Sequence, residues 1–129
     1  MAQGSLWPPS IRVDARTPVA ILRAQATELD EITKGALVGN VLTTGEDDGN
    51  TLRHDLEVLA PSLSYSRLIV TVRHRSDRVY PCGVFGEGVP GSPAGAQSQE
   101  KLEEILSKTF QSPEVISTLQ SLIAQSNEV

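Results

Sequence analysis

The chain has 129 residues and a formal net charge of -5, with 39% hydrophobic and 21% charged residues. This balance is typical of a folded globular protein, and the length suffices for one hydrophobic core but not for two. The acidic charge argues against a general binder of nucleic acid or anionic membranes, which needs a long-range positive field. Because aromatic residues are only 4%, the core must be aliphatic and base-stacking platforms are not expected.

Cysteine usage and the N-terminal residues bear on the compartment. Cys82 is the only cysteine, whereas small secreted domains often depend on several disulfides. Residues 1–16 hold no apolar stretch of signal-peptide length, and no run approaches the ~20 residues that span a bilayer. We therefore expect a cytoplasmic protein with no membrane partner.

The first elements in chain order are an arm and a helix. Residues 1–15 contain Trp7 followed by two prolines and show little periodicity, so we expect an irregular arm that Trp7 fastens to the body. Thr17 is a good N-cap and Pro18 suits the first helical position. Apolar residues then recur at helical spacing up to Lys34-Gly35, which predicts a helix over 18–33.

Four segments in the middle of the chain are apolar and β-branched, and they predict an antiparallel meander of four strands. They cover residues 36–44, 52–59, 65–74 and 78–85. The turn-rich segment 45–50 and the dipeptide Ser76-Asp77 connect neighbouring strands as hairpins. Pro81 indicates that the fourth strand lies at an edge or contains a bulge.

The last third of the chain predicts a connector and two helices. Residues 86–97 hold four glycines and two prolines, which indicates a flexible segment without regular structure. Ser98 and Ser112 then begin two helices with apolar faces, and their short connection predicts an antiparallel pair. The whole chain, 1–129, is thus expected to be a single domain with an α+β fold, a two-layer sandwich of helices against one sheet.

No catalytic, metal or cofactor site is predicted. The chain lacks the His-Glu-x-x-His, Cys-x-x-Cys, Gly-x-Ser-x-Gly and phosphate-loop patterns. In the expected register His74 and Cys82 point to opposite faces of the sheet, and His54 lies ~13 Å from His74. The sequence therefore predicts neither a catalytic Cys/His dyad nor a metal ion shared by the two histidines. The acidic turn 45–50 lacks the ligand spacing of an EF-hand and is expected to be solvated.

One surface stands out, because the third hairpin is expected to place five polar side chains on one face. They are Arg67, Arg73, Arg75, Arg78 and Tyr80. Such a face could bind a carboxylate-rich protein, a phosphate or a nucleic-acid backbone. The competing interpretation is a solvated surface whose arginines pair with the protein's own acidic residues. Ile69 and Val84 would lie beside the arginines, and a second copy could cover this apolar surface as a homodimer.

These observations favour a non-enzymatic module, a protein-interaction or regulatory accessory protein that uses the arginine face on an acidic protein partner. A first alternative is a small enzyme or ligand-binding protein with a pocket under segment 86–97, to which His54, Cys82 or Tyr80 contributes. A second alternative is nucleic-acid binding through the arginine face, which the acidic net charge disfavours.

Overall fold

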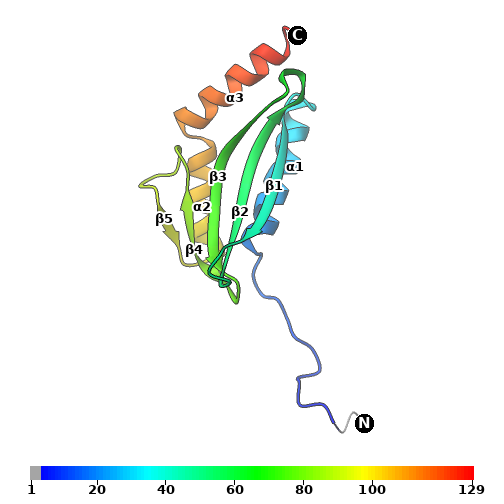
Figure 1. Ribbon diagram of the computed structural model, residues 1–129, viewed down its shortest axis with the longest axis vertical. Helices are drawn as coiled ribbons and strands as arrows, with labels where there is room; N and C mark the ends of the chain where they lie inside the picture. The colour runs from blue at the N-terminus through cyan, green and yellow to red at the C-terminus, as the bar shows by residue number, and fades with distance from the viewer. Residues whose placement is uncertain (1–3) are drawn as a thin grey trace.

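Five strands form one antiparallel sheet over residues 4–129, the part of the chain that the computed structural model of the protein describes. The strands are β1 (Val38–Gly45), β2 (Thr51–Ala60), β3 (Tyr65–Arg75), β4 (Arg78–Phe85) and β5 (Ala94–Ala96), and their order in space follows the chain. The helices are α1 (Pro18–Thr33), α2 (Gln99–Phe110) and α3 (Pro113–Ser126), with a short 3-10 turn, η1 (Pro61–Leu63). The helices cover one side of the sheet and leave the other open (Figure 1). The predicted α+β fold is confirmed, with five strands instead of four.

The fifth strand lies inside segment 86–97, which was expected to have no regular structure. Its residues, Ala94–Ala96, pair with β4. Small side chains carry a weak strand signal, so the sequence pattern does not reveal this strand, and its pairing depends on the edge that β4 offers. Pro81 lies in an irregular part of β4, because pairing with β3 passes directly from Cys82 to Arg78. The missing proline N–H therefore interrupts no regular ladder.

Helix α1 begins and ends as predicted and packs tightly on β1. The Thr17 hydroxyl oxygen accepts a hydrogen bond from the Ala20 N–H, and Lys34 ends the helix in the left-handed conformation. Gly39 on β1 is essential to the packing, because a Cβ there would lie 2.6 Å from the Cα of Ala26. Only a glycine allows the helix to approach the strand this closely.

Helices α2 and α3 begin at their predicted caps, Ser98 and Ser112. The predicted antiparallel pairing is wrong, because α3 turns across the end of the sheet instead of folding back along α2 (Figure 1). Its buried residues Val115 and Leu122 pack over β2, β3 and η1. Burial against the sheet thus determines the direction of α3. No helix in residues 4–129 is long and apolar enough to cross a membrane.

A β-bulge in β3 changes which residues face the helices. Leu56 of β2 pairs with Val70, whereas its neighbour Glu57 pairs with Leu68, so that Ile69 is an extra residue in β3. Because successive residues of a strand point to opposite faces, one extra residue exchanges the faces on its two sides. A second irregularity lies between His74 and Arg75 in the pairing with β4.

The bulge places Tyr65 and Arg67 on the helix side of β3, together with Val70, Val72 and His74 beyond it. Without the extra residue the two groups would lie on opposite faces. Ile69 and Val84 were expected on the open side beside the arginines. Both are buried in the core under the helices instead.

Residues 4–16 form no helix or strand and project away from the body (Figure 1). Their junction with α1 is held at Arg16, whose N–H donates to Gln99 Oε1 at 2.9 Å and whose carbonyl accepts from Tyr80 Oη at 2.8 Å. Trp7 is 77% exposed, so the expectation that it fastens the arm is wrong. The junction residue, not the tryptophan, holds the arm.

Candidate functional site

The structure divides the predicted arginine face. Arg73 and Arg75 lie on the open side of the sheet, whereas Arg67 and Tyr80 lie on the helix side, near its two ends. Arg78 is exposed at the β3–β4 turn. The single face predicted for these five residues is therefore wrong, because the two irregularities in β3 shift the alternation on which it was based.

Carboxylates already neutralise most of this positive charge. The ion pairs are Arg67 with Glu87, Arg73 with Glu46, and Arg75 with Asp77. At the centre of the open side, the Asp55 carboxylate accepts hydrogen bonds from Arg53 Nε at 2.9 Å and from the Thr71 hydroxyl at 2.7 Å. Exposed pairs of this kind add little stability, and they leave no concentrated positive field. The geometry gives no support to nucleic-acid binding through this face.

The histidines also differ from the prediction. His54 pairs with Val72 in the β2–β3 ladder, and the Nε2 atoms of His54 and His74 are 2.8 Å apart. His74 and Cys82 are direct cross-strand partners on the same face, not on opposite faces. The error for His74 and Cys82 comes from the irregularity in β4. The error for the two histidines comes from the extra residue in β3 together with the four-residue connection between β2 and β3.

The histidine pair forms a closed chain of hydrogen bonds. The Arg75 carbonyl can only accept, so His74 Nδ1 carries the hydrogen at 2.7 Å. When both rings are neutral, His74 Nε2 accepts from His54 Nε2, and His54 Nδ1 accepts from the Thr43 hydroxyl at 2.8 Å. Burial, assisted by His74 and by Arg23, lowers the pKa of His54 to about 4, so the ring is neutral near pH 7. Every ring nitrogen is used, and the pair has no free lone pair for a metal or substrate.

Cys82 and Tyr80 do not form an active site either. Burial raises the pKa of the Cys82 thiol to about 11 and that of Tyr80 to about 12, so neither is ionised near neutral pH. The hollow beside Glu87 and Gly88 has a volume of about 20 Å³, room for about one water molecule. Across residues 4–129 no three His, Cys, Asp or Glu side chains gather to hold a metal ion. The alternative of a pocket under segment 86–97 therefore gains no support.

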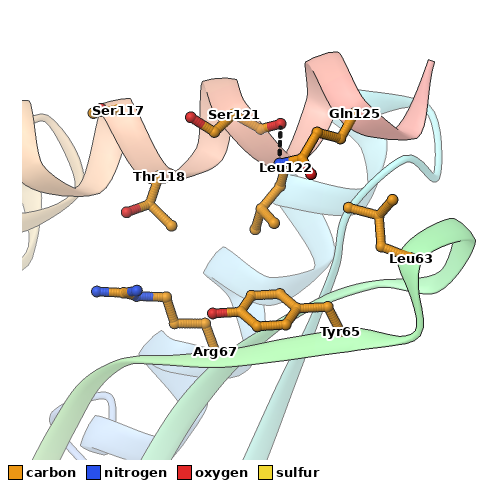
Figure 2. Close-up of a pocket in the computed structure, with 8 residues that line it drawn as sticks. All are labelled: Leu63, Tyr65, Arg67, Ser117, Thr118, Ser121, Leu122 and Gln125. Carbon is orange, nitrogen blue, oxygen red and sulfur yellow. Dashed lines mark hydrogen bonds between the residues drawn. The ribbon is translucent and has the colours of Figure 1, made fainter. Parts of the chain in front are cut away.

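A hollow that combines a charged side chain with several hydroxyl groups is the cleft between β3 and α3, shown in Figure 2. It has a volume of about 520 Å³. Its lining residues are Leu63 and Tyr65 and Arg67 on one side, and Ser117, Thr118, Ser121, Leu122 and Gln125 of α3 on the other. The Tyr65 phenol points along the strand toward Arg67, and the Arg67 guanidinium lies across the cleft from Thr118 of the helix (Figure 2). We call this hollow the β3–α3 cleft.

A free strand edge borders the β3–α3 cleft. Strand β4 pairs with β3 only from Thr71 onward, whereas β2 pairs with the whole length of β3. Within the described part of the chain, no strand lies on the β4 side of Tyr65–Val70. The Glu87 side chain, 71% exposed, reaches over this edge to Arg67 at 3.0 Å. Unpaired backbone groups of this kind can pair with a strand from another chain.

Arg67 is the fixed charge of the β3–α3 cleft. The neighbouring Tyr65 phenol and Glu87 raise its pKa further above the ordinary value, so the guanidinium remains charged at all ordinary pH values. Only Arg67 of these lining residues was predicted as a site residue. The hydroxyl residues were missed, although their positions, 117, 118 and 121, lie on one face of α3 and could have been recognised from the sequence.

Comparison of the chain with protein-family models, with curated proteins and with solved structures finds no match. A fold class by itself does not define a function, so the functional argument depends on the geometry of the site.

Proposed function

We propose that the protein is a non-enzymatic peptide-binding module. An extended segment of a partner protein pairs with the free edge Tyr65–Leu68 of β3 and lies in the β3–α3 cleft. The observation that carries the proposal is a free strand edge that faces a helix across a cleft of about 520 Å³. In this mode of recognition the main-chain hydrogen bonds supply affinity, and contacts with alternate side chains supply specificity.

The dimensions of the edge suit a short segment. Four residues at about 3.3 Å each extend over ~13 Å, so the partner contributes a strand of about four residues. The buried Leu122 gives the α3 wall of the cleft an apolar surface, and the hydroxyls of Thr118 and Ser121 on the same helix can donate to or accept from the peptide.

Arg67 supplies the preference for an acidic partner. Its present partner is the exposed Glu87, and exposed ion pairs are worth about 0–1 kcal/mol. A hydrogen bond to a charged group that is partly removed from water is worth about 1.5–3 kcal/mol, so a peptide carboxylate can replace Glu87. The acidic protein partner remains part of the proposal, but it now depends on Arg67 instead of a face of four arginines.

A selection experiment tests the proposal. A random-peptide phage library is panned against the full chain, and selected peptides are synthesised. We expect an acidic residue within a β-prone stretch of about four residues. In nitrogen-15 NMR titrations the peptides should shift the amide signals of Tyr65–Leu68 and of the α3 residues that line the cleft.

Two variants distinguish the β3–α3 cleft from general electrostatics. Arg67→Glu should weaken binding by about tenfold or more, because a charge-assisted hydrogen bond becomes a repulsion. Ser121→Tyr should also weaken it by filling the cleft. Arg75→Glu is the matched control, because Arg75 is an ion-paired arginine of the same strand on the open side of the sheet. Equal losses for Arg67→Glu and Arg75→Glu would contradict the proposal, as would shifts confined to the open side.

A further inference from the structure

A second hollow lies on the other side of α3, between α1 and α3. Its volume is about 300 Å³, at the lower end of ligand-binding pockets. Its lining is mainly apolar and includes Leu29 and Ile32 of α1, Ile69 of β3, and Ile116 and Leu119 of α3. Gln25 and the exposed Glu28 are its polar lining residues. Ile32 is 75% exposed and Ile116 is 37% exposed, so this α1–α3 groove presents uncovered apolar surface.

The N-terminal arm carries the complementary feature, which is apolar side chains without a packing partner. Leu6, Trp7, Ile11 and Val13 are all at least 74% exposed. Four large apolar side chains within eight residues are unusual for a solvated segment, and concentrated exposed apolar surface indicates an interaction site. Arg12 is the only charged residue between positions 4 and 13.

The junction at Arg16 directs this arm away from its own α1–α3 groove. Both backbone groups of Arg16 are held, one by Gln99 of α2 and the other by Tyr80 of β4. The arm leaves the body at the end where α1 begins, whereas the groove lies along residues 25–32 of α1 and against α3, near the opposite end (Figure 1). As the arm lies, it leaves its own groove uncovered and open to the arm of a second molecule.

We propose that two copies of the chain exchange arms, so that residues 6–13 of each copy lie in the α1–α3 groove of the other. Apolar side chains of the arm then cover apolar groove walls. Arg12 is complementary to Glu28, and the indole N–H of Trp7 can donate to the side-chain oxygen of Gln25 or Glu28. A fatty acid would suit the groove less well, because its carboxylate would approach Glu28.

The composition of the arm also favours docking. Pro8-Pro9 restricts the backbone to extended conformations, so the arm loses less conformational entropy on binding than a flexible segment does. Leu6 and Arg16 are ten positions apart, and at ~3.1 Å per residue this distance reaches ~31 Å. A reciprocal exchange forms a closed dimer with two equivalent contacts.

Trp7 is the only tryptophan, so its fluorescence reports on the arm alone. The donor chain is Ile116→Glu, which keeps Trp7 and has a charge in its groove. The acceptor chain carries Leu6→Ser and Trp7→Ser, so it has an intact groove, a disabled arm and no tryptophan. We expect addition of acceptor to donor to shift the Trp7 emission to shorter wavelength until one acceptor is bound per donor. Sedimentation should show a mixed dimer, whereas each variant alone stays monomeric.

Leu42→Glu is the matched control, because Leu42 is 44% exposed on β1 at the open side of the sheet and touches neither hollow. This variant should dimerise like the unsubstituted protein. If circular dichroism shows that Ile116→Glu is unfolded, Ile32→Glu takes its place, because Ile32 is largely exposed.

Three results would overturn the exchange. They are a monomeric unsubstituted protein with solvent-like Trp7 emission at high concentration, a monomer whose Trp7 is shielded at every concentration, and an equal loss of dimer in Leu42→Glu. Ser121→Tyr should leave the dimer intact while it blocks the β3–α3 cleft. The failure of this inference is thereby distinguishable from the failure of the proposed peptide binding.

Discussion

The two halves of β3 differ in what covers their edges. Thr71–Arg75 lies between β2 and β4, and its helix-side residues Val72 and His74 are buried and fully packed or hydrogen-bonded. Tyr65–Val70 has β2 on one side only, and Tyr65 remains 43% exposed. Strand β3 is thus paired on both sides where β4 accompanies it, and it has an unpaired edge where β4 ends.

The point at which β4 stops pairing with β3 has a physical cause at Gly86, where the chain leaves β4. A Cβ at Gly86 would lie 2.8 Å from the carbonyl oxygen of Ile69, so a larger residue could not pass β3 so closely. Beyond this point the chain continues through Glu87 toward β5 instead of pairing further with β3. The close passage and the departure together leave the first half of β3 without a neighbouring strand.

The largest expected difference between the two halves is in amide hydrogen exchange. Amides of Thr71–His74 should exchange only through global unfolding, whereas at least one amide of Tyr65–Leu68, pointing away from β2 at the unpaired edge, should exchange through local fluctuation. The rates should differ by a factor of about 10³ or more, given the usual stability of a domain. Exchange followed by NMR measures this. Uniform protection along β3 would show that the edge is covered.

The half of β3 that lies between β2 and β4 packs beside His54 of β2, and this histidine should make the free energy of unfolding depend on pH. The folded-state pKa of His54 is about 4, below its unfolded value of about 6.5, so the unfolded chain binds the extra proton between these values. The free energy of unfolding should therefore fall by about 3 kcal/mol as pH decreases from about 7 to about 4. Urea unfolding across this range measures the effect. His54→Gln, which cannot titrate, should lack this part of the slope, and an unchanged slope would disprove the role of His54.

Truncating one side chain in each half compares their packing. Val72→Ala should lower the free energy of unfolding by about 2 kcal/mol, because it removes two methyl groups from a site that is 0% exposed. Leu68→Ala, on the free half, should cost less than about 1 kcal/mol. Chemical denaturation of both variants is the measurement. Comparable losses would indicate that the two halves are equally packed.

The smallest expected change in the free energy of unfolding concerns Thr43, at the end of the series of hydrogen bonds through His54 and His74. Thr43→Val keeps the side-chain shape but removes the hydroxyl that donates to His54 Nδ1. We expect a loss of about 1 kcal/mol, the usual net value of such a hydrogen bond. Unfolding at neutral pH gives the loss, and the NMR signals of the His54 ring should shift. An unaffected ring would mean that Thr43 does not hold its tautomer.

Features with a local cause could be predicted from the sequence. Thr17, Pro18, Ser98 and Ser112 mark helix starts because each side chain or ring acts on the first turn of its own helix. The strand segments were recognisable because β-branched residues recur in short runs between turn residues. The candidate site was predicted poorly, since of its lining residues only Arg67 was named in advance.

The sequence by itself therefore determined the α+β class, the helix boundaries and four of the five strands, because these depend on neighbouring residues. Tertiary structure alone decided the register. The extra residue Ile69 is accommodated because both it and Val70 are buried in the core. The bulge that it forms exchanges the faces of β3 and so moves Arg67 to the helix side. It likewise decided the pairing of His54 with His74, the short β5 strand and the direction of α3. Each depends on what lies across the sheet or above it, and no local pattern records such a contact.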